Sequence, residues 1–152
     1  IYDQAFWLSE GMSCLGIGNQ KTLQFMADSS APQGTPGVIA SFVTGSRAVE
    51  FQQLSQDEQR SAVLADLVSY LGSDAGQPQE LVLQNWNEED WVSGAFTSYV
   101  TPGAWTTYGQ SWQEPHGRVH WAGTEASTRW RGYLEGALEA AANASDAIRR
   151  QI

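Results

Sequence analysis

The stretch over residues 119–137 constrains the fold of this chain more than any other. It begins with a short apolar segment, 119–122, whose pattern predicts a β-strand stopped by Gly123. A small polar turn follows, and an alanine-rich helix then runs to the C-terminus. A strand, a Gly-Thr turn and a helix N-terminus bring backbone N–H groups and the positive end of a helix dipole together. The pattern therefore predicts a place where an anion can bind.

Small residues recur along the predicted last helix. Gly132, Gly136 and Ala140 are spaced four residues apart, so they lie along one face. A face without large side chains allows another backbone, or a flat ligand, to come close. On spacing alone, tight packing of the helix on a sheet explains this face as well as ligand binding does. The apolar side of the helix is expected to carry Trp130, Leu134, Leu138, Ala141 and Ile148.

The order of residues in this stretch resembles a known signature. Residues 120–125 read H-W-A-G-T-E, and residues 130–137 read W-R-G-Y-L-E-G-A. This is similar to the C-terminal FAD-binding signature of the flavin-dependent amine oxidases, the family of monoamine, polyamine and related L-amino-acid oxidases. The resemblance covers most of the chain and is densest in its last third. Upstream matches in the family's order are Phe6-Trp7, Asn85-Trp86, Trp91 with Gly94, and Pro102-Gly103 through Tyr108-Gly109.

The resemblance implies an α/β (α+β) fold divided between two domains. Residues 1–100 are expected to supply part of a substrate-binding domain built on a mixed sheet. Residues 101–152 are expected to supply the C-terminal strand and helix of an FAD-binding domain. The family's G-x-G-x-x-G, which binds the ADP pyrophosphate, is absent, since residues 16–18 hold only a G-x-G fragment. We therefore expect a C-terminal piece of a longer flavoenzyme, whose missing N-terminal half is its partner.

Local patterns predict the elements of the first 100 residues. Strands are expected over 23–27, 38–43 and 80–86, where apolar or alternating residues lie between turn signals. Ser55 and Glu58 form a capping box, in which both side chains accept from free N–H groups at a helix start. Gly72 marks the C-terminal stop of that helix. Its apolar face is expected to consist of Val63, Leu64, Leu67, Val68 and Leu71.

Charge and cysteine content narrow the function classes. The net charge is −9, from Lys+Arg 8 against Asp+Glu 17, so a nucleic-acid surface is not expected. The single cysteine, Cys14, excludes an intrachain disulfide and suits a reducing compartment, so a cytoplasmic location is expected. No apolar run approaches ~20 residues, so no membrane span is expected.

The sequence gives little support for a metal site or for a cysteine nucleophile. His116 and His120 flank Gly117 without an acidic or cysteine partner, so no metal site is expected. Cys14 has no identifiable base beside it and is expected to be a small buried or loop residue rather than a nucleophile.

The resemblance assigns roles to single residues. Tyr133 and Phe96 match two aromatic residues that form a slot for the substrate amine, and Trp86 resembles the tryptophan beside the flavin ring. These three are the expected catalytic residues, and Phe25 joins Phe96 and Tyr133 as an expected substrate contact. Ala95 stands where animal monoamine oxidases carry the cysteine that bonds the flavin, so FAD is expected to be bound non-covalently. The expected cofactor-binding residues are Gly123, Thr124, Glu125, Gly132, Tyr133 and Leu134.

The implied activity is oxidation of a primary or secondary amine to an imine, with O2 as acceptor and H2O2 as product. FAD carries the redox step, and the protein supplies orientation and electrostatics. A small amine is the expected substrate, a homodimer is compatible with the resemblance, and the 152-residue chain alone is expected to be inactive. Two alternatives stay open: a non-catalytic interaction module that reuses this fold, or an L-amino-acid or polyamine oxidase.

Overall fold

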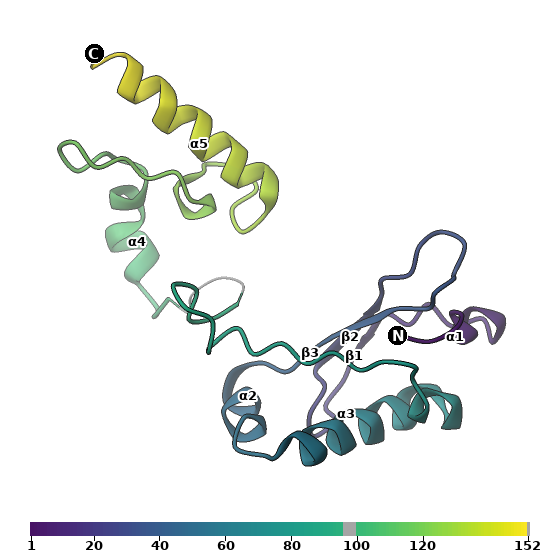
Figure 1. Cartoon of the computed structure of the whole chain (residues 1–152). Coiled ribbons are helices and arrows are strands. Elements are labelled where there is room, and N and C mark those ends of the chain that lie inside the picture. Colours follow the sequence, from purple (N-terminus) through teal and green to yellow (C-terminus); the bar gives the residue numbers. More distant parts are fainter. Residues whose placement is uncertain (96–99, 152) are drawn as a thin grey trace. The chain divides into compact units, whose positions relative to one another are not determined.

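The computed structural model describes residues 1–95 and 100–151 (Figure 1). Contacts divide the chain into two compact units: unit 1, Ile1–Asn85, and unit 2, Trp86–Ile152. Helices and short strands share the chain, which confirms the α/β class; the domain boundary at residue 100 stays a prediction. The elements are α1 (Phe6–Ser9), β1 (Gly16–Ile17), β2 (Phe25–Asp28), β3 (Ile39–Phe42), α2 (Gly45–Phe51), α3 (Gln56–Leu71), η1 (Ser73–Gly76), α4 (Ala104–Tyr108), η2 (Gly109–Trp112), η3 (Thr124–Ala126) and α5 (Leu134–Arg149).

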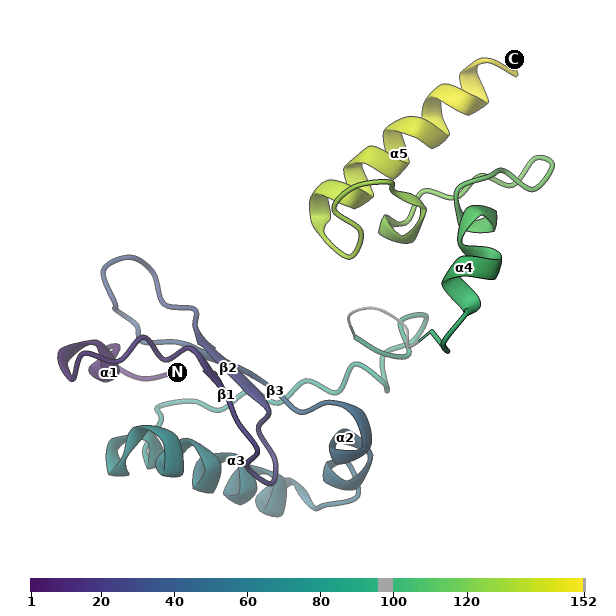
Figure 2. The same ribbon diagram turned by 180° about the vertical axis from the view of Figure 1, so that it is seen from behind.

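A small sheet forms the centre of unit 1. β2 lies between β1 and β3, and Phe25 is paired with Ile17 on one side and with Phe42 on the other. Met26, the next residue of β2, is buried in a cluster with residues of α3, and α3 runs along the sheet in both views (Figures 1 and 2). Both strand pairs are antiparallel, whereas the sequence predicts part of a mixed sheet; the part described here contains no parallel pair.

The core of unit 1 joins the N-terminal segment to the sheet and α3. Trp7 is fully buried, and its ring meets those of Tyr2 and Phe6 edge-on at 5.9 and 5.1 Å between centroids. Trp7 Nε1 also donates to Asp28 Oδ2 at 2.9 Å, which satisfies its only polar atom. The buried cluster consists of Tyr2, Ala5, Trp7, Cys14, Leu23, Met26, Val63, Leu67, Leu71 and Ala75.

One carboxylate is buried in this unit. Asp66, on the inner face of α3, accepts from the backbone N–H groups of Thr22 and Leu23, each at 2.8 Å. A buried charge is tolerated when hydrogen bonds replace its lost water. Asp66 therefore fixes α3 to the segment that leads into β2, a role that apolar patterning does not predict.

Several predicted elements are confirmed. The strands expected over 23–27 and 38–43 are β2 and β3: β2 is displaced by one or two residues, and β3 is one residue shorter at each end. Both bonds of the capping box are present: Glu58 N donates to Ser55 Oγ, and Ser55 N donates to Glu58 Oε2 at 2.9 Å. α3 ends at Gly72, whose φ of +85° suits glycine. Val63, Leu67 and Leu71 are buried as expected, whereas Val68 is exposed.

Two predicted strands are wrong. Residues 80–86 form no strand, and in 119–122 only Val119 makes a bridge, to His116. Apolar alternation produces a strand only where the segment pairs in register with a neighbouring strand, and neither segment forms such a ladder in the described chain. The third strand is instead β1, two residues long and therefore without a detectable pattern.

The last helix is confirmed, with a later start than predicted. α5 begins at Leu134, so Trp130 and Gly132 precede it and do not belong to its faces. Both have left-handed backbones, with φ of +54° and +86°, which an α-helix does not contain. Within residues 1–95 and 100–151, no helix has the length and apolar content required to cross a membrane.

Candidate functional site around the start of the last helix

The start of α5 lacks a side-chain cap. Its N-cap residue, Tyr133, is extended (φ −116°, ψ 162°) and makes no side-chain capping bond. In the described part of the chain, the backbone N–H groups of Leu134 and Glu135 have no hydrogen-bond acceptor. These donors lie at the positive end of a 16-residue helix, where negative charge is stabilised. The predicted anion-binding capacity of this segment therefore has free donors to support it.

Aromatic and apolar side chains surround these donors. Trp130 and Tyr133 meet edge-on, with 6.1 Å between ring centroids, and are 65% and 66% exposed. With Leu134 and Glu135 they line an open hollow of about 580 Å³. Leu134 is 88% exposed. The helix start thus combines free N–H donors with an uncovered apolar surface, a combination that suits a flat ligand with an electron-rich edge.

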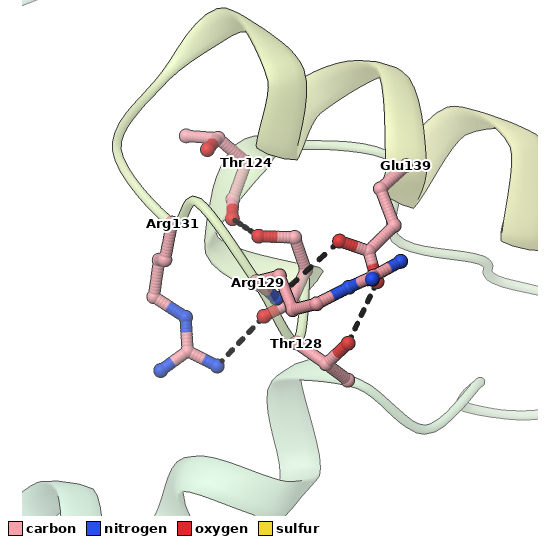
Figure 3. Close-up of polar contacts among 6 residues, drawn as sticks. Thr124, Thr128, Arg129, Arg131 and Glu139 are labelled. Carbon is pink, nitrogen blue, oxygen red and sulfur yellow. Dashed lines mark hydrogen bonds and ion pairs between the residues drawn. The ribbon is translucent and has the colours of Figure 1, made fainter.

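A single hydroxyl fixes the turn that precedes the helix. Thr124 Oγ1 accepts from Gly132 N at 2.8 Å and donates to the carbonyl oxygen of Tyr133 at 3.1 Å. Ser127, which is fully buried, donates from Oγ to the Thr124 carbonyl oxygen at 2.8 Å (Figure 3). Three of the predicted site residues, Thr124, Gly132 and Tyr133, are therefore brought together by hydrogen bonds.

The small residues of α5 bring backbone close, but the backbone belongs to a loop and not to the sheet that the packing interpretation expects. A Cβ atom on Gly136 would lie 2.3 Å from the Trp130 carbonyl oxygen and 2.8 Å from the hydroxyls of Ser127 and Thr124. Gly136 and Ala140 are both buried. What they contact is the chain's own preceding loop, so this part of the small-residue face is a packing surface.

Two further side chains hold the same loop. Glu139 of α5 accepts from Thr128 Oγ1 at 2.6 Å and from Arg129 N at 3.3 Å, and its pKa is lowered chiefly by the bond from Thr128 (Figure 3). Arg131 donates from Nη2 to the Ser127 carbonyl oxygen at 3.0 Å, and its guanidinium lies 4.3 Å from the ring centroid of Trp105. Sequence reasoning does not predict these roles, because the spacing of a charged residue does not reveal which loop atoms become its hydrogen-bond partners.

The remaining predicted site residues have the following positions in the structure. Trp86 is half exposed at the start of unit 2. Phe25 is on β2 of unit 1, where its ring stacks on that of Phe42 at 5.5 Å between centroids. Phe96 lies outside the described residues, and Ala95 beside it is exposed. Gly123 is extended, and Glu125 belongs to η3.

No alternative chemistry emerges from the described residues. Within them no group of three or more His, Cys, Asp or Glu side chains could hold a metal ion. Burial raises the pKa of the Cys14 thiol to about 11, so the thiolate needed for nucleophilic attack is scarce at neutral pH.

Comparison with known proteins gives one consistent result. A family model described as flavin containing amine oxidoreductase matches residues 1–149. An L-amino acid dehydrogenase of Synechocystis sp. is 41% identical over 147 residues, which are 97% of this chain and 31% of that protein. A probable flavin-containing monoamine oxidase A of Dictyostelium discoideum is 33% identical over 152 residues, covering 100% of this chain and 33% of that protein.

The comparison of structures agrees with the comparison of sequences. The structure of cyclohexylamine oxidase from Brevibacterium oxydans superposes with a TM-score of 0.90 at 30% identity, covering 99% of this chain and 33% of that chain. The chain therefore spans about a third of the length of the relatives it matches, 31% and 33% for the two curated proteins.

Proposed function

Because this chain belongs to the flavin-containing amine oxidoreductase family, we propose that the complete protein oxidises the C–N bond of an amine with the help of bound FAD. The chain would supply about a third of that enzyme, as it does of its relatives' length. The observation that carries the proposal is the start of α5, where free N–H donors adjoin the exposed Tyr133 and Leu134.

The residues at this helix start fit a flavin. The ring system of a flavin is flat and largely apolar, and its pyrimidine edge carries carbonyl oxygen and nitrogen acceptors. The Leu134 and Glu135 N–H groups would donate to that edge. The side chains of Trp130 and Tyr133, which line the same hollow, would lie beside the ring system. Gly123, Thr124 and Glu125 would lie near the pyrophosphate and ribityl chain. When bound, FAD would accept the two electrons that the amine C–N bond loses on oxidation, as a hydride equivalent.

The chain's own residues would contribute orientation and electrostatics. Negative charge on the cofactor edge is stabilised by the helix dipole and the free N–H donors of α5. The Tyr133 ring would hold the amine in place and exclude water, which favours the neutral amine over the ammonium form. Phe96 is proposed as the second wall of this slot, Trp86 as the tryptophan beside the flavin ring, and Phe25 as a wall of the substrate cavity.

Non-covalent binding of FAD is proposed because Ala95 has no thiol. Acid precipitation of the complete protein should release all flavin into the supernatant. Flavin fluorescence that stays with the precipitated polypeptide would show a covalent link and contradict this part. The 152-residue chain alone should be colourless and inactive with amines. A cytoplasmic location and a homodimer also remain proposals, which cell fractionation and sedimentation would test.

The decisive experiment is substitution of Tyr133 in the complete protein. Tyr133→Ala should lower amine turnover by on the order of 10²-fold, since misplaced reacting groups lose about that much, while flavin content and the melting temperature stay near wild type. Tyr108→Ala, which removes another exposed tyrosine of unit 2, is the matched control and should change none of the three. Wild-type turnover per bound flavin in Tyr133→Ala would refute the role of Tyr133.

A second candidate substrate is an L-amino acid, because the relative with 41% identity is an L-amino acid dehydrogenase. Assays with primary amines and with L-amino acids, each with O2 and with an artificial electron acceptor, separate the two candidates. Activity with L-amino acids and the artificial acceptor alone would favour the second. A complete protein that binds no flavin would instead support the interaction-module alternative.

A further inference from the structure

We propose that Thr124 is a positioning residue, which sets the geometry of the Trp130–Tyr133 turn through its hydroxyl and does not use that hydroxyl to bind the cofactor. The inference rests on the proposed function, and it differs from the expectation that Thr124 contacts the flavin directly. Thr124 Oγ1 has one proton, which it donates to the Tyr133 carbonyl oxygen, and it accepts from Gly132 N. The hydroxyl has no proton left for a ligand.

The two partners of Thr124 are the residues that decide where the helix starts. The Tyr133 carbonyl oxygen accepts both from Thr124 Oγ1 and from Ala137 N at 3.2 Å, the first bond of the α5 ladder. Gly132 N is the amide just before the N-cap residue. By holding both groups, Thr124 fixes the direction of the α5 axis relative to the preceding loop and hence the direction of the free N–H donors.

The turn requires such a constraint. Trp130 and Gly132 are both left-handed, and a tryptophan adopts that backbone only when its surroundings impose it. Thr124 is partly buried and lies against α5, because its Oγ1 is 2.8 Å from the position that a Cβ on Gly136 would take. The hydroxyl therefore lies between the Trp130–Tyr133 turn and the first turn of α5, and its hydrogen bonds are made to protein atoms.

Isosteric substitution separates the two roles of the hydroxyl in the complete protein. Thr124→Val keeps the shape and removes both hydrogen bonds, while Thr124→Ser keeps the hydroxyl. Thr107→Val is the control, because the Thr107 hydroxyl bonds to the Gly103 carbonyl oxygen inside α4, at 2.9 Å, and not to the turn. Two quantities are measured: exchange of the Gly132 amide hydrogen in flavin-free protein, and the Kd of added FAD.

A positioning role predicts a specific pattern. In Thr124→Val, Gly132 exchange should accelerate about tenfold and the Kd of FAD should rise about tenfold or more, the scale of one lost hydrogen bond. Thr124→Ser should restore both quantities to within about threefold, and Thr107→Val should change neither. The flavin reduction potential should also fall in Thr124→Val, because displaced N–H donors stabilise the reduced form less.

Other patterns overturn the proposal. A higher Kd with unchanged Gly132 exchange in Thr124→Val would identify the hydroxyl as a direct flavin ligand. Faster exchange with an unchanged Kd and potential would make Thr124 merely structural. If wild-type protein binds no FAD, the proposed function fails, whereas Gly132 exchange in the same samples still decides whether Thr124 sets the turn.

Discussion

The two units of this chain differ in how far their apolar side chains are buried. Unit 1 buries ten hydrophobic residues in one cluster around Trp7, the sheet and α3. In the described part of unit 2, Ala140 is the only buried hydrophobic side chain, while large ones such as Trp130, Leu134 and Leu138 are exposed. Unit 2 is instead shaped by hydrogen bonds around one loop, in which Thr124 and Ser127 donate to carbonyl oxygens and Glu139 accepts from Thr128.

This difference separates two ways of specifying structure. A buried cluster stabilises unit 1 in proportion to the apolar area it removes from water, about 25 cal/mol per Å². Single hydrogen bonds contribute less to stability, about 0.5–1.5 kcal/mol each, but they fix the directions of the groups they join. Surface substitutions in unit 1 are therefore expected to change its stability little, and core substitutions to change it strongly. In unit 2, substitutions that alter hydrogen-bond geometry are expected to matter most.

The largest effect is expected from Trp7→Ala. Removing this fully buried ring and its bond to Asp28 should lower the free energy of unfolding of the 152-residue chain by about 3–5 kcal/mol. Urea unfolding followed by far-UV circular dichroism measures the change. Trp121→Ala, at a half-exposed tryptophan of unit 2, is the control and should cost less than about 1 kcal/mol. Equal losses of the free energy of unfolding in the two variants would show that the two units do not differ in this way.

A smaller effect, of unusual sign, is expected from Gly136→Ala. Alanine normally stabilises a helix interior by about 1 kcal/mol relative to glycine. Here its Cβ would collide with the Trp130 carbonyl oxygen, so a loss of about 1–3 kcal/mol is expected. Thermal unfolding followed by circular dichroism measures it. As control, Ala142→Gly at an exposed α5 position should cost about 1 kcal/mol. Stabilisation by Gly136→Ala would show that the loop does not pack on α5 as described.

Alkali should weaken unit 1 by on the order of 1 kcal/mol. Burial raises the pKa of Cys14 from 9.0 to about 11, and burial with the nearby Cys14 raises the pKa of Tyr2 from 10.0 to about 12. The native state thus holds protons that the unfolded chain releases. Their stabilisation is complete below pH 9 and decreases as the pH rises to 11. Urea midpoints between pH 8 and 11 measure it, and Cys14→Ala should flatten the decline. An equal decline in Cys14→Ala would exclude the thiol as a cause.

The smallest effect is expected from Leu138→Gln. Leu138 is 67% exposed on α5, so a polar side chain there should change the free energy of unfolding of this chain by less than about 0.5 kcal/mol. Leu67→Gln on α3, at a buried position, is the matched substitution and should cost several times more. A comparable loss in both variants would mean that the exposed face of α5 is covered in solution.

Local signals in the sequence predict the fold best where the interaction itself is local. The two residues of the capping box, Ser55 and Glu58, are three positions apart, and α3 begins where they predict. The segments 80–86 and 119–122 have strand-like patterns without a strand, because pairing depends on an edge that the pattern does not contain. Asp66 is buried through partners more than 40 residues away, which no spacing rule reveals.

The candidate site shows the same limit. The motif places Thr124, Gly132 and Tyr133 together, and the structure joins them by hydrogen bonds. It does not reveal that Gly132 lies outside the helix, or that Arg131 stacks on Trp105. Motif spacing thus identifies which residues meet, while the direction of each bond depends on backbone angles such as the left-handed φ of Trp130.

The constrained turn at Trp130–Tyr133 has a consequence for binding entropy. Fixing the backbone of one residue costs about 1–2 kcal/mol of conformational entropy at 25 °C. Because Thr124 and the left-handed Trp130 and Gly132 already define this turn in the folded chain, that cost falls on folding. A ligand that docks here meets a surface whose shape is set beforehand, so its affinity is not reduced by the ordering of the turn.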